Sequence, residues 1–154
     1  MMNSSFSEQK NAYEALEVND EISVLTSGCS MQPMLKQHRD IVIIKRIDGK
    51  LKKGDVVLYP DNNGKFILHR IISVGKDTCV LRGDNNYFTE KNVKTNSIFG
   101  ILKEFYRDGK YINCKTDKKY KFYTFYILYS YPFRYFWKKI LRPLLSKIKH
   151  IIIK

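Results

Sequence analysis

Residues 56–81 read VVLYPDNNGKFILHRIISVGKDTCVL, and this stretch decides the fold class. Runs rich in Val, Ile, Leu and aromatic residues alternate in it with two clusters of Asp, Asn, Gly and Lys. The apolar runs have the length and composition of strands, and the polar clusters have the residues that tight turns favour. The stretch therefore predicts three strands, Val56–Tyr59, Phe66–Val74 and Thr78–Leu81, joined by two β-hairpins.

The same pattern continues on both sides of this stretch. Four further strands are predicted at Ile22–Thr26, Ile41–Arg46, Ile98–Tyr106 and Tyr111–Cys114. The dipeptides Asp48-Gly49 and Asp108-Gly109 are also turn signals, and we expect most of these breaks to be hairpins. Seven short strands favour a mainly β fold, in which an antiparallel sheet is coiled or barrel-like.

The rest of the chain flanks this β region. The 154 residues are enough for one domain with its own core. Helix propensity favours a short helix at residues 8–17, and residues 1–20 are expected to be a lead-in without a signal peptide or membrane span. Residues 21–117 are then the β domain, and residues 118–154 are a separate C-terminal extension.

The extension is strongly cationic and aromatic. Between Lys118 and Lys154 the sequence has ten Lys or Arg and no Asp or Glu, out of a net charge of +13. Eleven of the 21 aromatic residues lie between Tyr120 and Trp137. Helical spacing fits these aromatics, but alternation from Tyr123 to Tyr131 fits a strand nearly as well, and Pro132 interrupts either element.

Such a composition is typical of a helix that lies in a membrane interface, with aromatic rings at headgroup depth and basic residues on anionic lipid. We expect peripheral membrane contact through residues 120–154, most strongly at Leu141–Lys154, and no transmembrane helix. The alternative for Tyr120–Tyr131 is that the aromatics cover the sheet as part of the core. No signature of a nucleic-acid-binding fold accompanies the basic residues, so nucleic acid is not an expected partner.

A candidate nucleophile follows the first predicted strand, in the segment Gly28-Cys29-Ser30-Met31-Gln32-Pro33. A serine hydroxyl needs a neighbouring base to take its proton, and the N–H groups of a tight turn can stabilise the oxyanion that then forms. His69, within a predicted strand, is the candidate base. Cys29 is a rival nucleophile, but adjacent side chains in an extended turn point apart, so only one of Cys29 and Ser30 can face His69.

Four segments, taken in order, resemble the conserved boxes of type I signal peptidases and of the self-cleaving repressors related to them. They are Gly28-x-Ser30-Met31-x-Pro33 with Leu35, Gly54-Asp55 before Val56–Tyr59, His69-Arg70 before Ile71–Val74, and Gly83-Asp84-Asn85-Asn86, followed by a late strand around Gly100. The match extends from Glu21 to Leu102. The resemblance implies a coiled antiparallel sheet with Ser30 as nucleophile and His69 as base.

Because the base is a histidine, the chain resembles the archaeal and endoplasmic-reticulum types of this family, whereas the usual bacterial enzymes have a lysine. Histidine needs no large lowering of its pKa to act near neutral pH. The resemblance implies an acid that orients the histidine, and two residues match: Asp84 directly, and Glu90 at a position where the family has Asp. The alternative for Asp84 is a residue that only shapes a turn, and the alternative for Glu90 is a solvated charge. The choice between the two acids stays open.

Other residues of the first box have implied roles. Gly28 replaces a serine that lends its hydroxyl to the oxyanion in many relatives, so the N–H of Ser30 is the main expected donor. Met31 packs under the nucleophile and lines a substrate subsite in the family, and Pro33 stiffens the turn. The spacing of His and Cys residues, including Cys29, Cys79 and Cys114, predicts no metal site, no cofactor and no disulfide.

The sequence therefore predicts a serine endopeptidase that cleaves a leader-like or precursor peptide by acyl-enzyme chemistry, attached peripherally to a membrane, on its cytoplasmic side. A self-cleaving regulator is disfavoured, because about twenty residues before the first box leave no room for a DNA-binding domain. The remaining alternative is a catalytically inactive module that binds membrane or peptide on the same fold.

Overall fold

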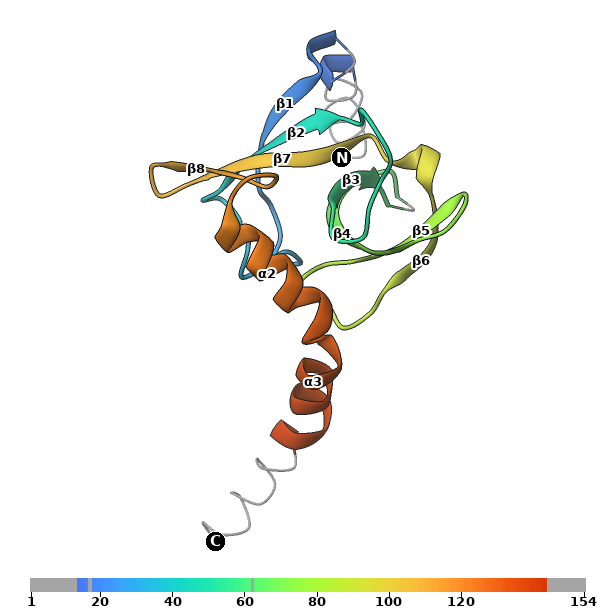
Figure 1. Cartoon of the computed structure of the whole chain (residues 1–154), viewed down its shortest axis with the longest axis vertical. Coiled ribbons are helices and arrows are strands. Elements are labelled where there is room, and N and C mark those ends of the chain that lie inside the picture. Colours follow the sequence, from blue (N-terminus) through green and yellow to red (C-terminus); the bar gives the residue numbers. More distant parts are fainter. Residues whose placement is uncertain (1–13, 17, 62, 144–154) are drawn as a thin grey trace, which may run out of the picture.

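The computed structural model describes residues 14–16, 18–61 and 63–143, and its centre is one eight-stranded antiparallel sheet (Figure 1). The strands are β1 (Glu21–Leu25), β2 (Ile41–Arg46), β3 (Val56–Pro60), β4 (Phe66–Val74), β5 (Thr78–Arg82), β6 (Glu90–Lys94), β7 (Gly100–Arg107) and β8 (Lys110–Asn113). A short 3₁₀ turn, η1 (Thr95–Ser97), precedes β7. The mainly β fold class is confirmed.

The sheet is curled into a half-barrel. Its strand order is β1-β2-β7-β3-β4-β5-β6, and β8 pairs with β7 beside this path. Successive strands from β3 to β6 are neighbours, and β7 returns between β2 and β3. Figure 1 shows β3 to β6 turning around one side of the molecule while β1, β2, β7 and β8 lie across the other.

One sequence prediction about this sheet is wrong, the number of strands. The sheet has an eighth strand, β6, whose sequence EKNVK contains a single β-branched residue and gave no signal; its pairing with β5 holds it in place. Asp48-Gly49 is not a hairpin turn, because β2 pairs with β1 and β7 whereas β3 pairs with β4 and β7. The other three breaks connect paired neighbouring strands, so the prediction that most of the breaks are hairpins is confirmed.

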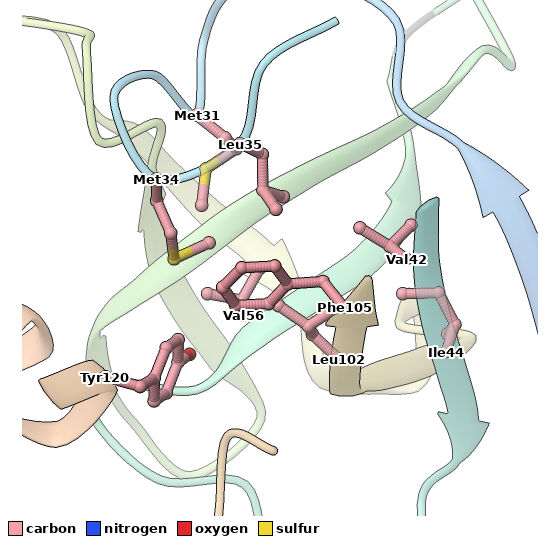
Figure 2. Close-up of a cluster of buried hydrophobic side chains, with 9 residues drawn as sticks. All are labelled: Met31, Met34, Leu35, Val42, Ile44, Val56, Leu102, Phe105 and Tyr120. Atoms are coloured by element: carbon pink, nitrogen blue, oxygen red, sulfur yellow. The ribbon is translucent and has the colours of Figure 1, made fainter. Parts of the chain in front are cut away.

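Two clusters of buried side chains stabilise the sheet. The first, shown in Figure 2, brings together side chains from the loop after β1, from the strands and from the C-terminal helix: Met31, Met34, Leu35, Val42, Ile44, Val56, Leu102, Phe105 and Tyr120. The second consists of Val57, Tyr59, Ile71, Cys79, Leu81 and Ile98. Because successive residues of a strand point to opposite faces, neighbours such as Val56 and Val57 enter different clusters.

After the sheet the chain is helical. The helix α2 (Lys118–Tyr129) begins at Asp117, whose carboxylate accepts a hydrogen bond from the N–H of Tyr120 at 2.7 Å. Ser130 separates it from α3 (Tyr131–Phe136), which continues as one π-helical segment, η2 (Trp137–Leu141). The helical interpretation of the aromatic spacing is therefore correct, and the strand alternative is wrong.

Two predictions concern the ends of the chain, a short N-terminal helix and C-terminal membrane contact. Residues 14–16 and 18–19 are helical, and the rest of the helix predicted at 8–17 lies outside the described residues. The expectation for Leu141–Lys154 falls mostly on residues 144–154, which are likewise outside them. Within the described parts of the chain, no helix is long and apolar enough to cross a membrane.

Candidate functional site

His69 lies buried on β4, with its Nδ1 atom held by two residues from other strands. Nδ1 is 2.9 Å from the hydroxyl oxygen of Tyr59 on β3 and 2.9 Å from Oε1 of Glu90 at the start of β6. The Tyr59 hydroxyl also donates a hydrogen bond to Oε2 of Glu90 at 2.5 Å. The three side chains form a closed triangle in which one carboxylate contacts both ring systems.

The triangle decides which ring nitrogen of His69 carries the proton. Burial and the neighbouring Glu90 carboxylate raise the pKa of Tyr59, so its hydroxyl stays protonated and its proton points to Glu90. Nδ1 then faces two acceptors, the Tyr59 oxygen and a Glu90 oxygen, and is assigned as the donor. Neutral His69 consequently has an unprotonated Nε2, the form that a general base requires.

The Nε2 atom is free to act. Among the described residues it has no hydrogen-bond partner, although the His69 side chain is only 4% exposed. In the described parts of the chain, Ser130 Oγ is the one fully buried side-chain N or O atom that lacks a hydrogen-bond partner. Since His69 Nε2 also lacks a partner but is not such an atom, it is not fully buried and keeps some access to solvent. Burial lowers the pKa of His69, and Glu90 opposes this effect without cancelling it. His69 is therefore neutral and proton-accepting at neutral pH.

Asp84, the other candidate acid, points away from His69. Its carboxylate makes a bidentate ion pair with Arg70, with Nε–Oδ1 and Nη2–Oδ2 distances of 2.8 and 2.7 Å. Both side chains are completely buried, and the hydroxyl of Tyr123 donates to the same carboxylate at 3.1 Å. Since Arg70 follows His69 in the strand, the two project to opposite faces of the sheet. The structure thus brings Glu90 to His69 and leaves Asp84 with Arg70.

Ser30 lies against the segment that contains Asp84. The N–H of Asn85 donates to the carbonyl oxygen of Ser30 at 2.8 Å, and the side-chain amide of Asn85 donates to the carbonyl of Cys29 at 3.2 Å. Gly83 is so close to Ser30 that a Cβ atom on it would lie 2.6 Å from Ser30 O and 2.9 Å from Ser30 Cβ. The segment Gly83-Asp84-Asn85-Asn86, here called the cradle, therefore packs against the loop that carries Ser30.

The register of the sheet predicts that Ser30 lies on the face that His69 occupies. The β4–β5 ladder ends with Arg70 opposite Arg82, and one further step in this register would set Gly83 opposite His69. Directly opposite residues point to the same face, and the space where the Gly83 side chain would be is occupied by Ser30. Within residues 14–16, 18–61 and 63–143, Ser30 Oγ forms no hydrogen bond, to His69 or to another group. Catalytic hydrogen bonds are often long without substrate.

The loop that carries Ser30 is fixed at both ends. Gly28 has a φ of +82°, which a residue with a side chain rarely adopts, and this turn reverses the chain after β1. Further along, the buried carboxylate of Asp40 accepts hydrogen bonds from the N–H of Lys36 at 2.9 Å and from Arg39 and Arg107. Between these points Met31 is 5% exposed and anchors the loop in the first core cluster. Cys29 and Pro33 are exposed.

Adding one methyl group at Gly83 should disturb this arrangement. We expect Gly83→Ala to lower the free energy of unfolding by about 1–3 kcal/mol, because the new Cβ overlaps Ser30 backbone and side-chain atoms. Urea denaturation of the two proteins measures the difference. Gly49→Ala is the matched control, since a Cβ there meets nothing within 4 Å, and it should change stability by less than about 0.5 kcal/mol. Equal stabilities of the two variants would contradict the tight approach.

A cavity of about 490 Å³ adjoins the triangle. Tyr59 and Glu90 are part of its lining, together with Ile67 and the strand β6. Among the described residues, β6 is the last strand in the order of the sheet. No group of three His, Cys, Asp or Glu side chains that could hold a metal ion occurs in the described parts of the chain.

Sequence reasoning missed Tyr59. It lies in an apolar run and has the signal of a core residue, which its ring is, being 1% exposed. Its alternation with Val57 could have indicated that both share the face of His69, since Val57 pairs with His69.

Comparisons of the chain with protein-family models, with curated proteins and with solved structures find no match.

Proposed function

We propose that this protein is a serine endopeptidase with the active-site organisation of histidine-type signal peptidases. In this proposal Ser30 is the nucleophile, His69 is the general base, and Glu90 is the acid that orients His69. Asp84, which the sequence offered as an alternative to Glu90, holds the Ser30 cradle in place through its ion pair with Arg70.

The observation that carries the proposal is the state of His69. A buried histidine that served only packing would have both ring nitrogens satisfied or enclosed. Here a carboxylate and a tyrosine fix Nδ1, whereas Nε2 has no partner among the described residues and keeps access to solvent. This is the arrangement in which an acid holds a histidine so that the opposite nitrogen can accept a proton from a serine.

The reaction would follow acyl-enzyme chemistry. Ser30 Oγ attacks the peptide carbonyl carbon while His69 Nε2 accepts the hydroxyl proton, and the N–H of Ser30, which donates to no acceptor in the described residues, stabilises the oxyanion. Collapse of the tetrahedral intermediate breaks the C–N bond, and His69 gives its proton to the leaving amine. A water molecule, deprotonated by His69, then hydrolyses the ester and restores Ser30.

The substrate class follows from the resemblance and from the sheet. Relatives bind an extended peptide as an added strand and prefer small side chains near the cleaved bond, and the same is proposed here. Gly28 is exposed beside Ser30 and makes no hydrogen bond within the described residues, so its backbone is accessible for such pairing. A leader or precursor peptide with an extended segment is the proposed substrate.

Two measurements test the proposal. A fluorophosphonate, which reacts covalently with activated serines, should modify the peptide that contains Ser30, as mass spectrometry would show. A peptide library should be cut by the wild type and not by Ser30→Ala. Ser27→Ala, at a neighbouring exposed serine, and Cys29→Ala are controls that should retain both reactions. Absence of any reaction that depends on Ser30 would favour the inactive binding module.

A further inference from the structure

The helices α2 and α3 carry a continuous row of apolar side chains that the sheet does not cover. These residues, here called the aromatic surface, are 48–73% exposed: Phe122, Phe125, Tyr126, Tyr129, Phe133, Phe136, Trp137 and Ile140. Exposed apolar side chains scattered singly are normal, but a contiguous row of this size marks an interaction site.

The aromatic surface is one face of a nearly continuous helical segment. Its core members, Phe122, Phe125, Tyr129, Phe133 and Phe136, follow one another at intervals of three or four residues, which places them in one stripe. The opposite side of α2 faces the protein, where Tyr120 and Ile127 are buried. The alternative prediction, that the aromatic residues of Tyr120–Tyr131 cover the sheet as part of the core, is therefore correct only for the inner side of α2. Figure 1 shows α3 extending away from the sheet beyond α2.

The charges around this surface have one sign. Lys118, Lys119, Lys121, Arg134, Lys139 and Arg142 belong to the same segment, and the sequence has no Asp or Glu after Asp117. Lys53 adds a further cation, with its ammonium 4.8 Å from the centre of the Tyr129 ring. Aromatic rings together with Lys and Arg match the interface of an anionic bilayer, where the rings lie at headgroup depth and the cations meet lipid phosphates.

We propose that the aromatic surface docks on the interface of an anionic lipid membrane. Charge complementarity and the exposed aromatic row support this docking, which does not depend on the peptidase proposal. Docking on the interface requires no transmembrane segment, and α2 and α3 would lie along the bilayer surface.

Docking would have a consequence for the Ser30 site. The helix α3 is attached to the segment that cradles Ser30: Arg134 donates to the carbonyl oxygen of Asp84 at 2.6 Å, and the Tyr131 hydroxyl donates to the carbonyl oxygen of Tyr87 at 2.7 Å. The guanidinium of Arg82 also stacks on the Tyr131 ring at 3.7 Å. A membrane bound to α3 would therefore lie close to the site, and a membrane-tethered peptide would be its substrate.

Vesicle binding tests the docking proposal directly. The chain contains one tryptophan, Trp137, and it belongs to the aromatic surface, so its fluorescence reports contact. Vesicles of phosphatidylglycerol and phosphatidylcholine should shift the Trp137 emission to shorter wavelength and carry the protein in flotation. Vesicles of phosphatidylcholine alone should bind at least about tenfold more weakly, and salt should weaken binding to the anionic ones.

Matched variants distinguish vesicle binding through the aromatic surface from non-specific binding of the protein to vesicles. The triple variant Phe122→Ser/Phe125→Ser/Phe133→Ser should bind anionic vesicles at least about tenfold more weakly, because its three rings are 61–73% exposed and should contribute little to the fold. Phe88→Ser/Tyr111→Ser, which removes two rings of 65–66% exposure elsewhere, should bind like the wild type. Equal binding by the triple variant, or no preference for anionic lipid, would overturn the proposal. The proposal would also be overturned if the wild type formed a dimer that did not bind vesicles and that the triple variant did not form.

The consequence for the substrate rests on the proposed peptidase function and is tested separately. A peptide substrate anchored to anionic vesicles should be cleaved faster than the same peptide free in solution, and the triple variant should lose this advantage but still cleave the free peptide. Failure to cleave either form would count against the peptidase, not against docking. Equal cleavage of both forms by a vesicle-bound wild type would overturn the link between docking and substrate.

Discussion

Asp84→Asn is expected to destabilise the protein by about 3–5 kcal/mol, as found when one partner of a buried ion pair is removed. The substitution leaves the Arg70 guanidinium charged, completely buried and without a counter-ion. Burial lowers the pKa of Arg70, but the charge and hydrogen bonds of Asp84, together with Tyr120, raise it above its ordinary value. Urea denaturation monitored by circular dichroism measures the loss.

The control is an ion pair at the surface. Asp48→Asn breaks the contact of Asp48 with Lys45, but Asp48 is 79% exposed, so the effect should be below about 1 kcal/mol. The double variant Arg70→Met/Asp84→Leu should recover part of the loss, because it leaves no buried charge unpaired. A different result would change the assignment: if Asp84→Asn kept full stability but lost reaction at Ser30, Asp84 would act on His69 directly.

The choice between Asp84 and Glu90 could not be made from the sequence, because it depends on one irregularity in the sheet. The β4–β5 ladder starts by pairing Val74 with Cys79 and Ser73 with Val80, and this register, if continued, would set Asp84 opposite His69. A bulge between Ile71 and Ser73 shifts the register by one residue. The shifted register, continued by one step, would set Gly83 opposite His69, and Asp84 pairs with Arg70 on the other face.

The strands themselves were more predictable than their pairing. Ile41–Arg46 and Phe66–Val74 are correct to the residue, because their composition leaves no competing interpretation. The strand β6 was missed because its stability comes from hydrogen bonds to β5 and not from its own residue types. Since β6 begins at Glu90, the same omission concealed how Glu90 reaches the site.

The C-terminal helices illustrate a different limit of prediction from sequence. The aromatic spacing indicated a helix, but it could not show that Tyr120 and Ile127 enter the protein while Phe122 and Phe125 stay outside. Arg70 is one residue that holds the inner side of α2 to the sheet, because it donates hydrogen bonds to Thr124 on α2 at 3.1 Å and to the Gly54 carbonyl oxygen at 2.8 Å. A contact between residues so distant in sequence has no local signal.

Glu90→Gln is expected to slow acylation of Ser30 by roughly 10²- to 10⁴-fold, because an amide at this position can present its N–H to Nδ1 and favour the wrong tautomer of His69. The pH profile should change as well. Burial already lowers the pKa of His69 and the Glu90 charge raises it, so removing that charge lowers the pKa further. The acidic limb of the rate should therefore move to lower pH than in the wild type. The rate of fluorophosphonate labelling against pH measures both effects.

Two further variants make this prediction specific. Tyr59→Phe removes one of the two oxygens near Nδ1 and the hydroxyl that donates to Glu90, so its loss of rate should be smaller, about tenfold, with the tautomer preserved by Glu90. Glu104→Gln alters a partly exposed carboxylate on β7 that pairs with Lys103, and it should leave rate and profile unchanged. If Glu90→Gln reacted like Glu104→Gln at every pH, Glu90 would be a neighbour of His69 without influence on its proton. The acyl-transfer role of His69 would then need another source of orientation.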